Sequence, residues 1–158
     1  MTYQITGLDP QPFASLFDMD DAALAVRNAR RVVAQADRGY PCRISLEDAR
    51  KDEVLILVNH ISHDVPTPYR SSYAIYLRPG AQKAAYIDTV PPIFESRPLG
   101  MRGFDQDGML RDAKLALADE ADAAIRDLFA NPGIAYIDAH NAAHGCFAAR
   151  IERHGGLS

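Results

Sequence analysis

The sequence predicts an α+β fold, a single domain over residues 1–158 with a mainly antiparallel β-sheet and a few peripheral helices. Strongly patterned segments are mostly strand-sized, helical patterns are few, and connections are short. A chain of 158 residues suits one domain and buries about 70% of its unfolded surface. The composition is 47% hydrophobic and 24% charged, which excludes collagen, coiled coil and wholesale disorder.

Most strand predictions rest on short apolar or alternating runs. Residues 53–59 contain five consecutive aliphatic side chains, the pattern of a strand covered on both faces. Residues 72–78 alternate instead, with Tyr73, Ile75 and Leu77 on one face. We expect further strands at residues 3–7, 32–34, 99–104, 109–115, 134–140 and 146–153, strand-like alternation at 42–46, and a proline-rich loop at 88–98.

Two pairs of these strands are predicted to form hairpins. Residues 105–108 make the first turn, where Gly108 suits the positive φ angle of a type I turn with a bulge. This turn resembles the start of an EF-hand loop, but Leu110 and Ala116 stand where glycine and glutamate are required, so the hairpin is favoured. The loop at 141–145 joins the last two strands.

Three segments have helical patterns. The strongest is residues 120–130, with Asp119 as the expected N-cap. Its apolar face is formed by Ala121, Ala124, Ile125, Leu128 and Phe129. A short, alanine-rich helix is expected at 20–29 with Asp20 as its N-cap, and a helical turn at 9–17.

The charge balance argues against nucleic acid as a partner. Acidic residues outnumber basic ones, 21 to 17, and the net charge is -4, whereas nucleic-acid-binding domains are usually basic. Arg27, Arg30 and Arg31, followed by Arg38, form the nearest approach to a basic cluster. We interpret this segment as an exposed helix-to-strand junction, in preference to a phosphate site.

No segment has the pattern of a membrane span or an export signal. The longest apolar run, 54–58, falls far short of the ~18 residues that a membrane helix needs. Residues 1–7 lack a basic region followed by an apolar stretch, so we expect no signal peptide and a cytoplasmic, soluble protein. Two cysteines are too few for a disulfide scaffold and are expected to be free thiols. The GxSxG, P-loop and GxGxxG motifs are missing, and no cofactor is predicted.

Four of the five histidines occur in two pairs near strand ends. His60 and His63 follow one predicted strand, and His140 and His144 bracket the last hairpin loop. A zinc site made of His60, His63 and His140 would have the three protein ligands of catalytic centres. The HExxH motif is missing, and loop histidines are common at surfaces, so the prediction is that no metal binds.

Each cysteine has neighbours that suggest chemistry. Cys42 directly precedes Arg43, and an adjacent cation can make a thiol more reactive. His140 would then serve as its base. The alternative is that Cys42 is a small core residue, as free cysteines usually are. Cys146 closes the hairpin that carries His140 and Asn141.

Tyr69 and Arg70 lead into the alternating strand. Pro68 favours an extended conformation at Thr67, and an arginine held at a strand start can bind a carboxylate or phosphate through two hydrogen bonds. The alternative for Arg70 is a structural salt bridge with one of the 21 acidic residues.

Three stretches together resemble the bacterial family known as domain of unknown function 1203 (DUF1203). They are Tyr-Pro-Cys-Arg-Ile-Ser-Leu-Glu-Asp-Ala at 40–49, Thr-Pro-Tyr-Arg-Ser-Ser-Tyr-Ala-Ile at 67–75, and the last hairpin at 136–151. The resemblance covers nearly the whole chain and implies no activity. One departure is Tyr73-Ala74, where the family pattern tends to carry Gly-Pro, so a pocket floor is expected to differ there.

The polar residues of these stretches lead to our main hypothesis for function. Arg43 and Arg70 would clamp a small anionic ligand, while His140 and Asn141 would orient it, with Tyr69 and Cys146 beside them. His140 or Cys42 would be the catalytic residue of an enzyme. Two alternatives stay open: a thiol- or metal-dependent protein using Cys42, Cys146 and the histidines, and a protein-interaction domain without catalysis. The sequence decides neither the reaction nor the oligomeric state.

Overall fold

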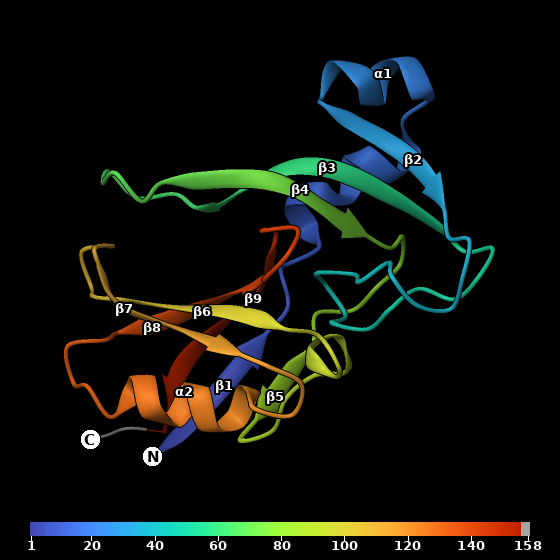
Figure 1. Cartoon of the computed structure of the whole chain (residues 1–158). Coiled ribbons are helices and arrows are strands. Elements are labelled where there is room, and N and C mark those ends of the chain that lie inside the picture. Colours follow the sequence, from blue (N-terminus) through green and yellow to red (C-terminus); the bar gives the residue numbers. More distant parts are fainter. Residues whose placement is uncertain (156–158) are drawn as a thin grey trace.

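Two antiparallel sheets, one above the other, make up the computed structural model, which describes residues 1–155 (Figure 1). The larger sheet has the strand order β5-β1-β9-β8-β6-β7 and the smaller one β2-β3-β4. The strands are β1 (Thr2–Thr6), β2 (Ala29–Val33), β3 (Val54–His63), β4 (Ser71–Leu77), β5 (Ala85–Ile87), β6 (Leu99–Phe104), β7 (Leu110–Ala116), β8 (Tyr136–Asn141) and β9 (Phe147–His154). The predicted α+β class with a mainly antiparallel sheet is therefore confirmed.

The main core lies between the larger sheet and helix α2 (Ala121–Phe129), which covers its lower face (Figure 1). All five residues of the predicted apolar helix face are buried. They pack against the alternate side chains of the central strands, including Ile137 and Ile151. Because a strand points successive side chains to opposite faces, residues such as Asp138 and His140 point away from α2, towards the smaller sheet.

A second core lies between the smaller sheet and two short helices, η1 (Gln11–Asp18) and α1 (Asp21–Val26). It contains Ile56 and Val58 of β3 together with Ile75 and Leu77 of β4. Their neighbours Leu57 and Tyr76 therefore lie on the opposite face of the same sheet. Among the helices described over residues 1–155, none combines the length and apolar character that crossing a membrane requires.

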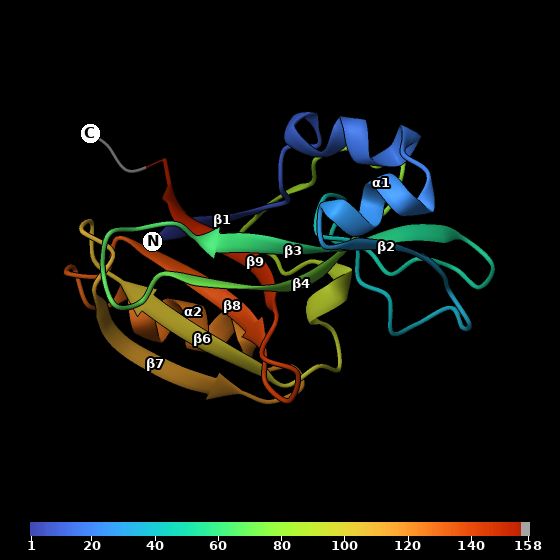
Figure 2. The same ribbon diagram turned by 90° about the horizontal axis from the view of Figure 1, so that it is seen from above.

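The tip of the β3–β4 hairpin docks on the β6–β7 turn and so holds the small sheet over the large one (Figure 2). The Thr67 hydroxyl donates a 3.1 Å hydrogen bond to the Gly108 carbonyl. Gly108 has φ +83°, and a Cβ atom there would lie 2.8 Å from Val65. Glycine is thus required by both conformation and contact. The turn itself is the predicted hairpin, with Asp105 accepting the N–H groups of Asp107 and Met109.

Several local predictions were wrong. Residues 42–46 form a turn, closed by a 2.9 Å bond from the Leu46 N–H to the Cys42 carbonyl, with Leu46 at φ +57°. Asp119 has φ +67° and is not the N-cap of α2; Glu120 is. Alternation and cap preference are local signals, and tertiary contacts override them.

Element boundaries also differ from those expected. Helix α1 begins after its predicted cap, Asp20, which accepts the N–H of Ala23, but it ends at Val26 because Asn28 turns the chain into β2 with φ +54°. Strand β3 runs four residues further than predicted, to His63. The short edge strand β5 was not predicted, and the expected proline-rich loop contains a 3₁₀ turn, η2 (Pro92–Phe94).

Candidate functional site

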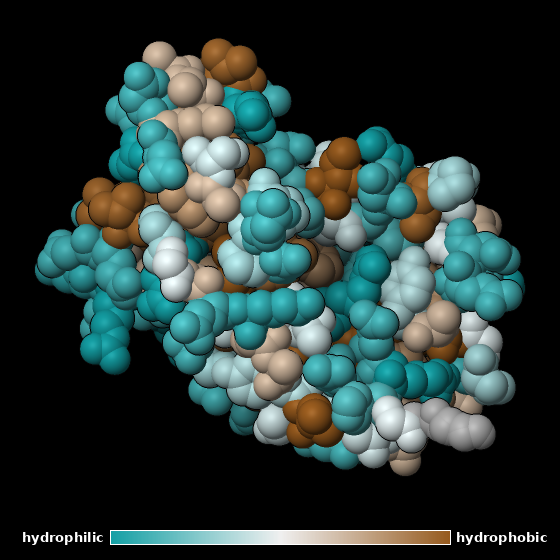
Figure 3. Space-filling model, turned by 180° about the vertical axis from the view of Figure 1, so that it is seen from behind, coloured by the Kyte–Doolittle hydropathy of each residue, from teal (hydrophilic) through white to brown (hydrophobic). Residues whose placement is uncertain are grey.

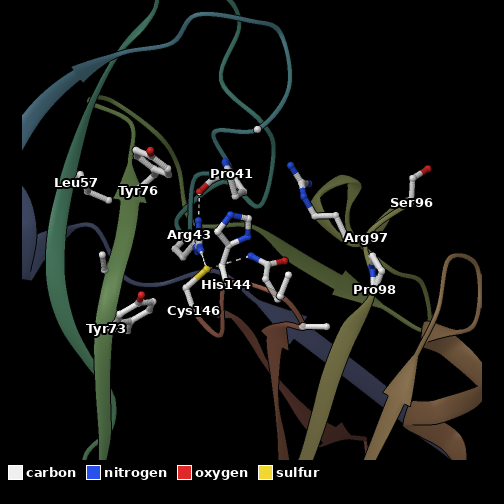
Figure 4. Close-up of a pocket in the computed structure, with 15 residues that line it drawn as sticks. Pro41, Arg43, Leu57, Tyr73, Tyr76, Ser96, Arg97, Pro98, His144 and Cys146 are labelled. Atoms are coloured by element: carbon white, nitrogen blue, oxygen red, sulfur yellow. Dashed lines mark hydrogen bonds between the residues drawn. The ribbon is translucent and has the colours of Figure 1, made fainter.

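A cavity of about 530 Å³ opens where β4, the 39–43 segment, the 96–98 segment and the β8–β9 hairpin meet (Figure 4). One wall is polar and carries Arg43, Arg97, Asn141, His144 and Cys146. The other wall is mostly apolar and is supplied by Leu57, Tyr73, Ala74 and Tyr76 of the small sheet. A cavity of this size and mixed lining is typical of small-molecule sites.

Arg43 is the central residue of the polar wall and is only 2% exposed. Its Nε donates to the Phe147 carbonyl at 2.7 Å, and its Nη1 donates to the Pro41 carbonyl at 2.5 Å. Its Nη2 donates to the Cys146 sulfur at 3.1 Å. Phe147 lies at a β-bulge between β8 and β9, where an irregular ladder leaves a carbonyl for a side chain to bond. Side-chain bonds therefore fix the guanidinium in place.

The Cys146 sulfur receives two donors. Besides Arg43, the Asn141 side-chain amide donates to it at 3.3 Å. The hairpin that carries both residues is closed by a 2.9 Å bond from the Asn141 N–H to the Cys146 carbonyl. His144 lines the same cavity, and Figure 4 shows its ring next to the Arg43–Cys146 pair.

The charges of the two cavity arginines are balanced in different ways. Arg97 is neutralised by Asp48, whose carboxylate it contacts at 2.6 and 3.0 Å. Within residues 1–155, no carboxylate lies in ion-pair distance of Arg43. Burial lowers the pKa of Arg43, and the neighbouring Cys146 opposes that shift. A buried cation without a counterion is costly, so the two carbonyl oxygens and the Cys146 sulfur that accept its hydrogen bonds compensate it.

His140, a predicted catalytic residue, does not line this cavity. Its Nδ1 lies 2.9 Å from the Gly145 carbonyl, which can only accept, so Nδ1 carries the proton. Its Nε2 lies 3.4 Å from Nη1 of Arg102, and burial lowers the pKa of the imidazole. The neutral His140 side chain therefore stabilises the hairpin loop through its hydrogen bond to Gly145. His144, which the sequence placed only in the hairpin loop, lines the cavity instead.

Cys42 is fully buried in the core beneath α1. Its sulfur accepts the N–H of Arg78 at 3.3 Å. Side chains of successive residues point in different directions, and here Arg43 faces the cavity while Cys42 faces the core. The structure thus places Cys42 in the core position that was the alternative to a catalytic role.

Tyr69 and Arg70 also lie apart from the cavity. The backbone N–H of Arg43 donates to the carbonyl of Tyr76, so Arg43 lies beside Tyr76 on β4. Arg70 lies six residues before Tyr76, and because the chain between them is extended, the two are roughly 20 Å apart. The exposed Arg70 pairs with Asp64 at 3.0 Å, the structural salt bridge of the alternative interpretation. The Tyr69 carbonyl accepts from Nδ1 of His63 at 2.9 Å. The structure does not bring the two predicted arginines together.

A second polar cluster fills the space between the sheets. His63 accepts a 2.6 Å hydrogen bond from the Tyr136 hydroxyl, and Arg150 lies over the Tyr136 ring at 4.4 Å. Arg150 also holds the fully buried Asp138 at 2.8 and 3.0 Å. In the part of the chain that the structure describes, no group of three His, Cys, Asp or Glu side chains is arranged to hold a metal ion, and His60, His63 and His140 do not form such a group.

These features define an α+β domain with a cysteine–arginine cavity at the junction of two antiparallel sheets. The chain belongs to the family described as Protein of unknown function (DUF1203), whose model matches residues 39–153. All residues that line the cavity fall within this range. No curated protein and no solved structure shows a significant match to the chain.

Proposed function

We propose that the protein uses Cys146 as a nucleophile towards a small electrophilic molecule held in the cavity. The observation that carries this proposal is the hydrogen bond from the buried Arg43 guanidinium to the Cys146 sulfur, with no carboxylate beside Arg43 in residues 1–155. Cationic donors favour the thiolate, which is the reactive form of cysteine. The Asn141 amide adds a second donor to the same sulfur.

The cavity contains the groups that such an addition needs. A lone pair of the Cys146 sulfur forms a bond to the electrophilic carbon of a double bond in the ligand. The π electrons of that double bond shift to its other end, which then carries the negative charge. A proton from water or from His144, which lines the cavity, completes the addition. The apolar wall, with Leu57, Tyr73 and Tyr76, would hold the body of the ligand.

Alkylation kinetics test this proposal. In Cys42→Ser, which leaves Cys146 as the single thiol, iodoacetamide should modify the folded protein roughly tenfold faster at about pH 7 than the same chain unfolded in urea. Peptide mass spectrometry identifies the modified residue. Asn141→Asp keeps the side-chain shape but replaces the donor with a carboxylate, so it should slow the reaction.

Two results would contradict the proposal. One is a Cys146 thiol in the folded protein that reacts no faster than in the unfolded chain. The other is an Asn141→Asp variant that is folded, by circular dichroism, yet alkylated at the rate of its Cys42→Ser parent. Cys146→Ser, in which only the core residue Cys42 remains, is the control for background labelling and should react slowly.

The buried charge of Arg43 favours a second candidate, a small anion bound beside it. This retains the Arg43, Asn141 and Cys146 part of the predicted anion site and omits Arg70. Inorganic phosphate tests it: an anion seated at Arg43 should protect Cys146 from alkylation, whereas potassium chloride of equal ionic strength should not. Equal rates in the two salts would exclude it.

An interaction domain without catalysis receives less support. On the face shown in Figure 3, brown hydrophobic side chains are scattered among teal hydrophilic ones. Docking surfaces usually show a contiguous apolar patch. The mixed lining of the cavity is the more specific feature.

A further inference from the structure

A second cavity, of about 300 Å³, adjoins the first on the face of the small sheet opposite η1 and α1. Leu57 and Ala74 line both cavities. The other residues around the second cavity are Asn28, Arg30, Val58 and Asn59. The two cavities therefore adjoin at Leu57 and Ala74, and we refer to them together as the groove, which leads from Cys146 across the sheet to Arg30.

The register of the small sheet explains how the groove is built. Arg30, Leu57 and Tyr76 are paired in a row across β2, β3 and β4. Asn59 of β3 and Ala74 of β4 are paired in a second row. Asn28, just before β2, continues this row, because its carbonyl accepts the N–H of Asn59 at 3.3 Å. Paired residues share one face of a sheet, so these rows are the floor of the groove.

The row also sets the length of the groove. The Arg43 N–H bonds the Tyr76 carbonyl at 3.0 Å, so the 41–43 segment lies beside β4 as a further step. From Arg30 to Leu57, from Leu57 to Tyr76 and from Tyr76 to Arg43 are three steps between adjacent strands. At about 4.8 Å each, they separate Arg30 from Arg43 by roughly 14 Å. A ligand that spans both cavities is therefore elongated.

The far end of the groove carries a free positive charge. Within residues 1–155, Arg30 donates only to the Ala29 carbonyl, at 2.9 Å, and no carboxylate is in ion-pair distance of it. Its neighbour Arg31 differs, because it is paired with Asp21 at 2.9 Å. Asn28 and Asn59 add polar side chains beside Arg30. This end suits an anionic group, while Leu57 and Ala74 suit an apolar chain.

We propose that the groove binds an elongated molecule with an apolar middle and an anionic terminus. Its electrophilic end lies at Cys146, its middle crosses Leu57 and Ala74, and its anionic terminus lies at Arg30. The assignment of the reactive end rests on the proposed function of Cys146. Asn28 and Arg30 precede the matched residues 39–153, so family membership does not imply this end of the groove.

Three maleimides test the groove in the Cys42→Ser background. They are N-ethylmaleimide, an N-alkylmaleimide whose linear chain ends in a carboxylate, and the same chain ending in trimethylammonium. The carboxylate probe should modify Cys146 faster than the trimethylammonium probe by about two- to fivefold, the size expected for an exposed ion pair. Arg30→Glu should reverse this preference, and the matched control Arg31→Gln should retain it.

Further outcomes separate the groove from the reactive cysteine. Ala74→Phe should obstruct the passage between the cavities and slow both long probes more than it slows N-ethylmaleimide, because only the long probes extend past Ala74. An unchanged preference in Arg30→Glu would overturn the groove proposal even if N-ethylmaleimide labels Cys146 rapidly. Slow labelling by all three probes would instead overturn the nucleophile proposal.

A second measurement does not depend on the thiol. Dodecanoate, an apolar chain with a carboxylate terminus, should bind the wild-type protein in calorimetry. Arg30→Glu should weaken that binding by about two- to fivefold, and Arg31→Gln should leave it unchanged. Equal affinities of the Arg30→Glu and wild-type proteins would overturn the proposal whatever the reactivity of Cys146.

Discussion

Nη2 of Arg43 lies 3.1 Å from the Sγ atom of Cys146, although 103 residues separate the two in the chain. The contact joins the turn after residue 40 to the last hairpin. Arg43 also bonds the carbonyls of Pro41 and Phe147, so one side chain connects the two segments that form the polar wall of the cavity. This guanidinium therefore serves the fold as well as the site.

Replacing Arg43 should destabilise the protein strongly. Arg43→Met leaves two buried carbonyls without their donor, and we expect a loss of about 3–5 kcal/mol in the free energy of unfolding. The matched control is Arg70→Met, because Arg70 is exposed and forms a surface ion pair with Asp64. That control should change stability by about 0.5 kcal/mol or less. Urea titrations measure both, and equal losses would contradict the structural role of Arg43.

Removing the Tyr136 hydroxyl should loosen the contact between the sheets. In Tyr136→Phe, Nε2 of the buried His63 loses its donor, at a cost of about 1–2 kcal/mol. Tyr73→Phe, at an exposed position on β4, is the control and should be nearly neutral. Thermal unfolding followed by circular dichroism gives the comparison. A Tyr136→Phe variant as stable as Tyr73→Phe would contradict the interpretation.

Breaking the buried ion pair of Asp138 should also be costly. Asp138 is fully buried, and Asp138→Asn leaves Arg150 with a neutral partner. We expect a loss of about 3 kcal/mol, because the remaining charge stays partly buried. Asp112→Asn, at an exposed position on β7, is the control for the loss of a carboxylate in general and should hardly change the free energy of unfolding. Guanidinium unfolding curves distinguish these outcomes.

Acid should destabilise the protein through His140 and His60. Burial lowers the pKa of both imidazoles from the ordinary value of 6.5. The unfolded state therefore binds protons more readily, so their contribution to stability is complete above about pH 6.5 and is lost as the pH falls towards their folded pKa values. Unfolding free energies at about pH 7.5 and 5.5 measure the loss. It should be smaller in His60→Gln/His140→Gln, and an unchanged loss would contradict this prediction.

The elements with strong, regular patterns could be predicted from the sequence. The apolar spacing of residues 121–129 follows the helical period, and all five predicted core positions are buried. Residues 42–46 show the limit of such patterns. Their alternation is that of a strand, but Leu46 adopts φ +57° and the segment turns so that Arg43 reaches Pro41, Cys146 and Phe147. A local sequence pattern cannot predict contacts with residues as distant in the chain as Cys146 and Phe147.

The site was predictable only in part. Arg43, Asn141 and Cys146 were expected to lie together, and the structure brings them together. Arg70 was expected there too, but an extended strand carries it roughly 20 Å away from the residue that bonds Arg43. His140 and Asn141 are neighbours at the end of β8, beside a register irregularity between Ala139 and His140, and of the two only Asn141 lines the cavity.

The sequence by itself determined the α+β class, most of the strands, the main helix and the few residues able to carry chemistry. These follow from hydrophobic period and residue type, which are local properties. Tertiary structure alone decided which of those residues meet. The docking of the small sheet over the large one puts Arg43 beside Cys146, buries Cys42 in a core, and leaves Arg70 at the surface. Such contacts depend on register and side-chain direction across distant segments, because a shift of one residue along a strand moves each side chain to the other face.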